Sequence, residues 1–205
     1  MGAAAFFAGG SADRARRLLI KIGWGCLSDP PVMIAVMTVE RPMPPLNADE
    51  RTTLESWLDF YRSTLAMKCE GLGEEQVRRA SVTPSPLTLL GLVQHMAEVE
   101  RNWFRRVLTG EEVGPVHAPG GDPEGHDGGF DLTEHVSSTT VRQAWEAEIA
   151  LSRANCAARA LEETSPFMGG AVTLRWIYTH MIAEYARHCG HADLLRERID
   201  GATGV

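Results

Sequence analysis

The sequence predicts an all-α protein, and more closely a four-helix bundle. Four long segments carry apolar residues at the helical spacing of about 3.6 residues per turn. No segment shows a convincing alternation of apolar and polar residues, the pattern of a half-buried strand. Stretches rich in Gly and Pro separate the segments. Amphipathic helices bury their apolar faces against one another, and a bundle is an arrangement of four helices that does so.

The first predicted helix spans residues 47–69. Asn47 precedes Glu50 at the spacing of a capping box, in which two side chains close a helix N-terminus. Leu54 and Leu58 then begin an apolar stripe with the helical period. The pattern therefore places the start of the bundle at Asn47.

Residues 1–46 differ from the rest of the chain, because they begin small and featureless and end rich in Pro. We expect a poorly ordered N-terminal extension or the product of too early a start codon, with Met37 as the candidate for the true start. The segment resembles a signal peptide only faintly, since Lys21 interrupts its apolar run and no A-x-A cleavage site follows. We assign residues 47–201 to one domain.

The second predicted helix spans residues 87–108. Pro84 and Pro86 precede it and end the connector from the first helix, and Gly110 follows it as a residue suited to a helix C-terminus. Its apolar stripe consists of Leu92, Met96, Val99, Trp103 and Val107.

Residues 111–137 are rich in Gly, Pro and Asp. We predict a surface loop that partly covers the site, and not a calcium loop, because the regular spacing of acidic ligands is missing. The segment contains the histidines His117, His126 and His135.

The third predicted helix spans residues 139–162 and the fourth spans residues 172–201. We expect a short link between them. The residues of the third helix that we expect to face inward are Val141, Trp145, Ile149, Ser152 and Cys156.

The composition argues against two classes of partner. The chain has 205 residues and a formal net charge of −7, which is unsuited to binding nucleic-acid phosphates. No apolar run is long enough to span a membrane. The four cysteines occur singly, which is typical of a reducing compartment, so we expect a cytoplasmic protein. Helix bundles with exposed apolar flanks often form dimers, and a homodimer is a further hypothesis.

Glu184 and His188 lie in the apolar stripe of the last helix, four residues apart. Residues at this spacing are neighbours on a helix surface, so a carboxylate oxygen and an imidazole nitrogen can reach a common point. Burying both groups costs free energy unless something compensates, and a metal ion would do so. His95 lies beside Leu92 and Val99 on the second helix and is the third candidate.

We predict that His95, Glu184 and His188 bind a divalent metal. Two histidines and one carboxylate with a vacant position are typical of catalytic zinc sites, whereas structural zinc sites close all four positions. Ni²⁺ and Fe²⁺ accept the same ligands. His180 and His191 lie one turn to either side and are alternative ligands, partners that orient the ligands, or surface residues. A structural alternative makes Glu184 and His188 a buried ion pair and His95 an ordinary core residue.

Two segments carry a resemblance to a known family. From about Met37 to Gly201 the chain resembles the DinB-like superfamily of metal-binding four-helix bundles, which includes mycothiol- and bacillithiol-dependent transferases. The segments are LTLLGLVQHMAEVERNWF around His95 and HMIAEYARHCGHADLLRERIDG around Glu184 and His188.

Many relatives use three histidines, whereas Glu184 stands here in the place of one of them. This set resembles the His, Glu and His ligands of mycothiol-dependent maleylpyruvate isomerases, and it implies the same roles for His95, Glu184 and His188. Those isomerases have a further C-terminal domain with a catalytic arginine, so we do not expect isomerisation from a chain that stops at Val205.

The resemblance implies a metal-dependent, preferably zinc-dependent, thiol S-transferase that acts in detoxification. The metal would activate a low-molecular-weight thiol such as mycothiol for attack on an electrophile. We expect no catalytic base among the ligands, and we consider Arg187, Arg196 and Tyr185 as contacts for an anionic thiol. The alternative function is a metal-binding stress or interaction protein without turnover.

Overall fold

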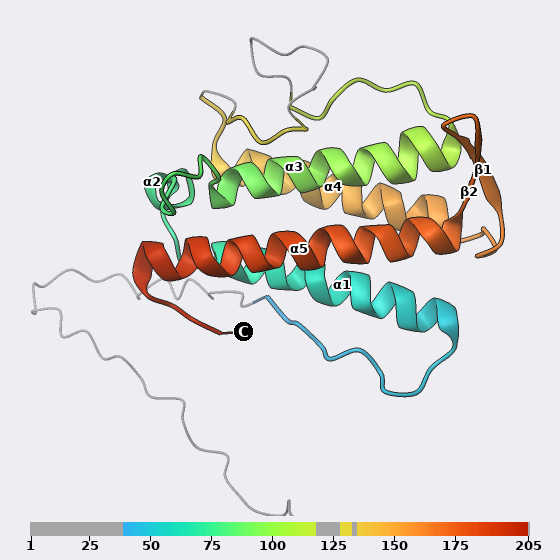
Figure 1. Ribbon diagram of the computed structural model, residues 1–205, viewed down its shortest axis with the longest axis horizontal. Coiled ribbons are helices and arrows are strands. Elements are labelled where there is room, and N and C mark those ends of the chain that lie inside the picture. Colours follow the sequence, from blue (N-terminus) through green and yellow to red (C-terminus); the bar gives the residue numbers. More distant parts are fainter. Residues whose placement is uncertain (1–38, 118–127, 133–134, 205) are drawn as a thin grey trace, which may run out of the picture. The chain divides into compact units, whose positions relative to one another are not determined.

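The computed structural model describes residues 39–117, 128–132 and 135–204, and its architecture is mostly helical (Figure 1). The described residues form five helices, a π-helical segment that continues one of them, and a two-stranded sheet. In chain order these elements are α1 (Glu50–Cys69), α2 (Glu74–Val77), α3 (Leu89–Arg101), the π-helical segment η1 (Asn102–Val107), α4 (Ser138–Cys156), β1 (Thr164–Phe167), β2 (Gly170–Thr173) and α5 (Leu174–Asp200).

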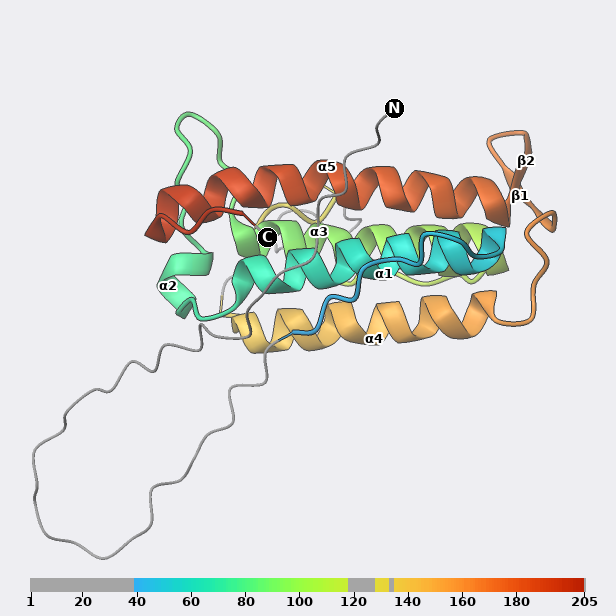
Figure 2. The same ribbon diagram turned by 90° about the horizontal axis from the view of Figure 1, so that it is seen from below.

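The four long helices lie side by side in two perpendicular views (Figures 1 and 2). Helices α1 and α5 run in one direction, and α3 and α4 run in the opposite direction. Helix α4 therefore begins at the end of the molecule where α3 also begins. The long connection between α3 and α4 leads the chain back along the length of the helices. The helices therefore do not simply alternate in direction along the chain.

Each long helix begins after a residue whose side chain caps it. Oδ1 of Asp49 accepts a hydrogen bond from the backbone N–H of Thr52 at 3.0 Å, so α1 begins after Asp49. The predicted start of this helix at Asn47 is wrong, because Asp49 satisfies the first turn instead. The caps of α3, α4 and α5 are Thr88, Ser137 and Thr173.

The third predicted helix is too long, because α4 ends at Cys156 and a β-hairpin precedes α5. Strands β1 and β2 pair antiparallel, and Met168 and Gly169 form the two-residue turn with φ values of 48° and 76°. Positive φ at both turn positions matches the right-handed twist of the strands. The prediction of no strands is wrong here, because strands of 4 residues are too short to show an alternating pattern.

Helix α2 is a single turn within the connector between the first two predicted helices. Glu74 accepts hydrogen bonds from the backbone N–H of Ser138 at 2.9 and 3.2 Å and also pairs with Arg78 at 2.6 Å. Because Ser138 is the first residue of α4, this carboxylate joins α2 to the N-terminus of α4.

Residues 39–46 lie along α1 (Figure 2). The N–H of Val39 donates to Oε1 of Glu70 at 2.7 Å. The Arg41 guanidinium donates to the Thr64 hydroxyl and lies 4.5 Å above the centre of the Phe60 ring. These contacts hold residues 39–46 against α1. The rest of the expected N-terminal extension lies outside the described residues.

The apolar stripes face the interior as predicted. On α3 and η1, Leu92, Met96 and Trp103 are buried, while Val99 and Val107 are partly buried. All five predicted inward residues of α4 are buried. Within the described residues, no helix has the length and hydropathy needed to cross a membrane.

A carboxylate at the centre of this interior joins all four long helices. Glu100 of α3 is fully buried and accepts two hydrogen bonds from Arg62 of α1, each at 2.8 Å. It also accepts from the Ser152 hydroxyl of α4 and the Tyr185 hydroxyl of α5, both at 2.7 Å. The Trp145 indole N–H donates to the oxygen of Tyr185 at 2.8 Å. The buried charge is therefore paired and hydrogen-bonded from several sides.

Candidate metal centre

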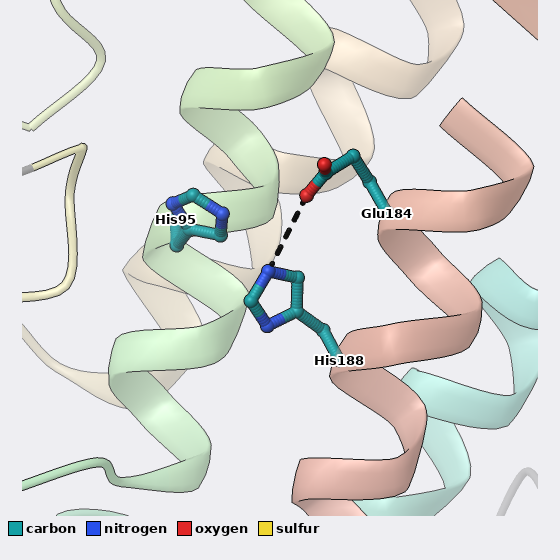
Figure 3. A group of neighbouring side chains, drawn as sticks. All are labelled: His95, Glu184 and His188. Atoms are coloured by element: carbon teal, nitrogen blue, oxygen red, sulfur yellow. Dashed lines mark ion pairs between the residues drawn. The ribbon is translucent and has the colours of Figure 1, made fainter. Parts of the chain in front are cut away.

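His95 of α3 faces Glu184 and His188 of α5 across the boundary between the two helices (Figure 3). Each residue offers one potential ligand atom, and these three atoms lie within 4.8 Å of one another. Nε2 of His188 is 3.5 Å from Oε2 of Glu184, and the two imidazole rings have centres 4.7 Å apart. The structure thus brings together the three residues that the sequence analysis singled out.

The orientation of His95 is set by residues far along the chain. Its Nδ1 lies 2.6 Å from the carbonyl oxygen of Gly128. A carbonyl only accepts, so Nδ1 carries the hydrogen and Nε2 is the nitrogen that could bind a metal. The ring of Phe130 stacks on His95 with centres 3.9 Å apart and an interplanar angle of 14°.

His188 is buried, and its other ring nitrogen has a partner on the same helix. Its Nδ1 lies 3.2 Å from Nδ1 of His191. Burial, followed by the neighbouring His95, His191 and Arg187, lowers the pKa of His188 to about 4. The imidazole is therefore neutral at pH 7, which is the form that binds a metal.

Glu184 is only slightly exposed and lies between two basic side chains. Nε2 of His180 is 3.8 Å from Oε1 of Glu184, and Nη1 of Arg187 is 3.4 Å from the same oxygen. Burial, opposed by the nearby Glu184, lowers the pKa of His180. His180 and His191 thus each contact one of the candidate ligands.

The segment 128–132 packs closely against the face of α3 that carries His95. The Gln94 amide donates to the carbonyl of Asp131 at 2.8 Å and to that of Gly129 at 3.3 Å. A Cβ atom at Gly91 would lie 2.7 Å from the carbonyl oxygen of Phe130, so only glycine permits this approach. The prediction that part of the connection covers the site is confirmed for these residues.

The described histidines of residues 111–137 do not belong to the candidate metal group. His117 is buried, and burial lowers its pKa. The N–H of its neighbour Val116 donates to Oε2 of Glu98 at 2.7 Å. His135 is exposed with a φ of 65°, and His126 lies outside the described residues.

Two of the three residues considered as contacts for an anionic thiol have other roles. Tyr185 is fully buried and bonded to Glu100, so its predicted role is wrong: the apolar stripe turns it into the interior. Arg196 donates to the backbone carbonyls of Lys68 and Glu70 near the end of α5. Arg187 is largely exposed beside Glu184.

These side chains fit a divalent cation of the zinc type. Ligand atoms about 2.1 Å from a tetrahedral zinc ion lie about 3.4 Å apart, close to the 3.5 Å between His188 and Glu184. The donor set of two nitrogens and one oxygen also suits Ni²⁺ and Fe²⁺. His95 and His188 each have their second ring nitrogen engaged, as metal-binding histidines usually do.

The sequence analysis missed Gln94, Phe130 and the two glycines before Phe130. Gln94 lies on α3, but its partners in segment 128–132 follow no helical period, and their contact with α3 is formed only in the folded chain. The Gly-Gly-Phe order was the one available signal, because paired glycines allow a backbone to approach a helix closely.

A comparison with protein families matches residues 53–201 to a family model described as Mycothiol-S-transferase. The match covers more than half of the chain. A comparison with curated proteins finds no match.

Proposed function

Because the chain belongs to the mycothiol S-transferase family, which is part of the DinB-like superfamily, we propose that it is a divalent-metal-dependent thiol S-transferase. Its thiol substrate is mycothiol, and its second substrate is an electrophile. Zinc is the proposed metal, with Ni²⁺ and Fe²⁺ as alternatives. The reaction suits a role in detoxification.

The observation that carries this proposal is the convergence of His95, Glu184 and His188 from two distant segments. Their ligand atoms lie within 4.8 Å of one another. Three protein ligands leave a coordination position for a substrate, as in catalytic zinc sites. A structural ion pair of Glu184 and His188 would not need an imidazole of the other helix beside it.

The side chains around the centre have distinct tasks in this proposal. A bound divalent cation supplies the positive charge that lowers the pKa of a thiol. The carbonyl of Gly128 accepts a hydrogen bond from Nδ1 of His95 and so orients Nε2 as the nitrogen that would bind the metal. Phe130 covers one side of that ring and excludes water there. His180, whose Nε2 lies 3.8 Å from Oε1 of Glu184, would accept the thiol proton and pass it to the buffer.

The experiment that tests the proposal combines metal analysis with turnover. Zinc-loaded protein, mycothiol and monochlorobimane should give the fluorescent thioether faster than the two reagents alone. His95→Ala should lose both the metal and the activity. His135→Ala is the matched control, since this exposed histidine is outside the metal group, and it should keep both.

The outcomes separate the alternatives. Bound metal without adduct above background favours a metal-binding stress or interaction protein without turnover. Equal metal content in the parent and in His95→Ala favours the structural ion pair.

The remaining proposals concern the molecule as a whole. We propose that α1, α3 with η1, α4 and α5 constitute a four-helix bundle of the DinB-like type, and that residues 47–201 are its domain. A cytoplasmic location is proposed because low-molecular-weight thiols are kept reduced there. We propose no nucleic-acid or membrane partner, and a homodimer remains a proposal to be tested by mass measurement in solution.

A further inference from the structure

One face of α5 carries Trp176, His180, Glu184 and His188, each four residues after the last. Residues at this spacing form a continuous row along a helix. The residues of α3 and η1 that face this row run in the opposite direction along the chain: His95 faces His188, and Trp103 faces His180. The His95 ring lies 4.7 Å from that of His188, and Trp103 lies 4.5 Å from His180. The metal centre is therefore one end of a row whose other end is aromatic.

Trp103, Trp176 and His180 form this aromatic end, which we term the aromatic surface. The Trp176 and His180 rings are stacked, with centres 5.0 Å apart and an interplanar angle of 8°. Trp103 lies 5.3 Å from Trp176 and is supported from β1 by Phe167 at 5.1 Å. The Trp103 ring is tilted by 48° to Trp176 and by 55° to His180. The surface is therefore a stacked pair of rings that Trp103 and Phe167 hold in place.

The aromatic surface is open to solvent at Trp176. This side chain is 47% exposed, whereas Trp103 is 8% exposed. Exposing a large aromatic side chain forgoes the free energy that its burial would contribute. Met168 in the hairpin turn is 89% exposed as well. An exposed tryptophan in a row with a metal centre is suited to stacking against a flat ligand.

We propose that the aromatic surface binds the electrophile and selects one with a planar aromatic or conjugated ring. This inference rests on the proposed thiol transfer for the identity of the ligand. His180 connects the two ends of the row, since it stacks on Trp176 and lies 3.8 Å from Glu184. A planar ring that packs against the exposed part of Trp176 therefore lies beside the row of side chains that leads through His180 to Glu184.

A binding experiment tests the surface without turnover. Calorimetric titration of the full chain with 1,3-dinitrobenzene, a ring without a leaving group, should show binding with and without zinc. Trp176→Ala should weaken it about threefold to tenfold, which corresponds to the loss of one aromatic pair. Trp176→Phe should retain most of it.

The matched control is Trp57→Ala. Trp57 is also exposed, at 36%, and stacks on Tyr61 of α1, far along the chain from the metal centre. This variant should bind 1,3-dinitrobenzene as the parent does. Equal binding by the parent and Trp176→Ala, or no binding by the parent, would overturn the inference.

A kinetic experiment separates this inference from the proposed function. With 1-chloro-2,4-dinitrobenzene the mycothiol sulfur forms a bond to the ring carbon, the carbon–chlorine bond breaks, chloride leaves with its electron pair and the thiol proton passes to the buffer. Iodoacetamide reacts by the same kind of displacement, with iodide leaving, but has no ring. Trp176→Ala should lower kcat/KM about threefold to tenfold for the aromatic electrophile alone.

The two failures are distinguishable. Absence of turnover with either reagent, together with ring binding that depends on Trp176, contradicts thiol transfer and supports the aromatic surface. Turnover of both reagents that is insensitive to Trp176→Ala supports thiol transfer and overturns the aromatic surface.

Discussion

The candidate metal ligands are oriented by atoms that would not touch the metal. The Gly128 carbonyl engages Nδ1 of His95, and Nδ1 of His191 lies 3.2 Å from Nδ1 of His188. A bond between two imidazole nitrogens requires one of them to carry the hydrogen. If Nε2 of His188 faces the metal, its Nδ1 donates to His191, which fixes the ring.

Replacement of His191 should weaken metal binding without removing a ligand. His191→Phe loses the acceptor for His188 and should lower zinc affinity about tenfold to a hundredfold, measured by competition with a chromophoric chelator. His191→Asn keeps a polar atom near the position of Nδ1 and should retain more of the affinity. Equal affinities for both variants and the parent would mean that this contact does not orient His188.

Helical spacing was enough to single out the three candidate ligands that the structure brings together, but not their partners. Four-residue spacing placed Glu184 and His188 together, and a polar residue on an apolar stripe singled out His95. Tyr185 of α5 was wrongly expected to contact the thiol. Helical spacing does not distinguish a side chain that bonds a buried carboxylate such as Glu100 from one that contacts a substrate. Gly128 could not be predicted, since its contact with His95 depends on the path of a loop.

At the scale of elements, segment 128–132 closely approaches the helix α3 that carries His95. The carbonyl oxygen of Phe130 occupies the space that a side chain at Gly91 would need. Helix α3 therefore has a glycine in its first turn despite the cost in helix stability. The packing of Phe130 over His95 therefore depends on the absence of a side chain at Gly91.

A pair of glycine substitutions tests this packing. Gly91→Ala should lower the free energy of unfolding by about 1–3 kcal/mol, since the backbone of Phe130 has to move. Gly190→Ala on α5 is the control, because nothing lies within 4 Å of its added Cβ. It should raise the free energy of unfolding by up to about 1 kcal/mol through helix propensity. Urea unfolding measures both, and a neutral Gly91→Ala would contradict the close approach.

The attachment of α2 to α4 should depend on pH. The bonds from Ser138, followed by the one from Arg78, lower the pKa of Glu74 to about 2. A lowered carboxyl pKa stabilises the folded state above the usual value of 4.5, and this contribution disappears as the pH falls through about 2.

Glu74→Gln should therefore cost less than about 1 kcal/mol at neutral pH, because the carboxylate is largely exposed. The difference from the parent should shrink between about pH 5 and pH 2, as measured by urea unfolding at several pH values. A difference that does not vary with pH would show that the charge of Glu74 does not matter for this attachment.

The long helices could be predicted as elements, whereas the short ones could not. Periodicity over several turns identified α1, α3, α4 and α5. Helix α2 and the hairpin are too short for a period, and only the turn at Met168 and Gly169 offered a local signal. The N-cap of α1 is Asp49 and not the predicted Asn47, because both residue types suit this position and both occur near the start of the helix.

At the scale of the whole molecule, Glu100 connects the four long helices through Arg62, Ser152 and Tyr185. These partners lie far apart in the sequence, so no local pattern could predict the group. Pairing with Arg62 offsets the cost of removing both charges from water. The helices are consequently held in register by a polar centre as well as by apolar packing.

Replacing one partner of the Arg62–Glu100 pair should lower the free energy of unfolding more than replacing both partners together. Glu100→Met alone leaves the Arg62 charge buried and should lower the free energy of unfolding by about 3–5 kcal/mol. The double variant Arg62→Met with Glu100→Met should recover much of that loss, since neither charge remains. Urea unfolding of the parent, both single variants and the double variant gives the coupling. Purely additive losses would contradict a direct pairing.

The row on α5 constrains how the chain can change during evolution. Trp176 and His188 are separated by twelve positions of one uninterrupted helix, a distance of about 18 Å along its axis. Substitutions at the outward positions between them leave the row intact. An insertion or deletion of one residue there would rotate one end against the other by about 100° and separate the tryptophan from the ligands. This part of the chain should therefore tolerate changes of residue type but not changes of length.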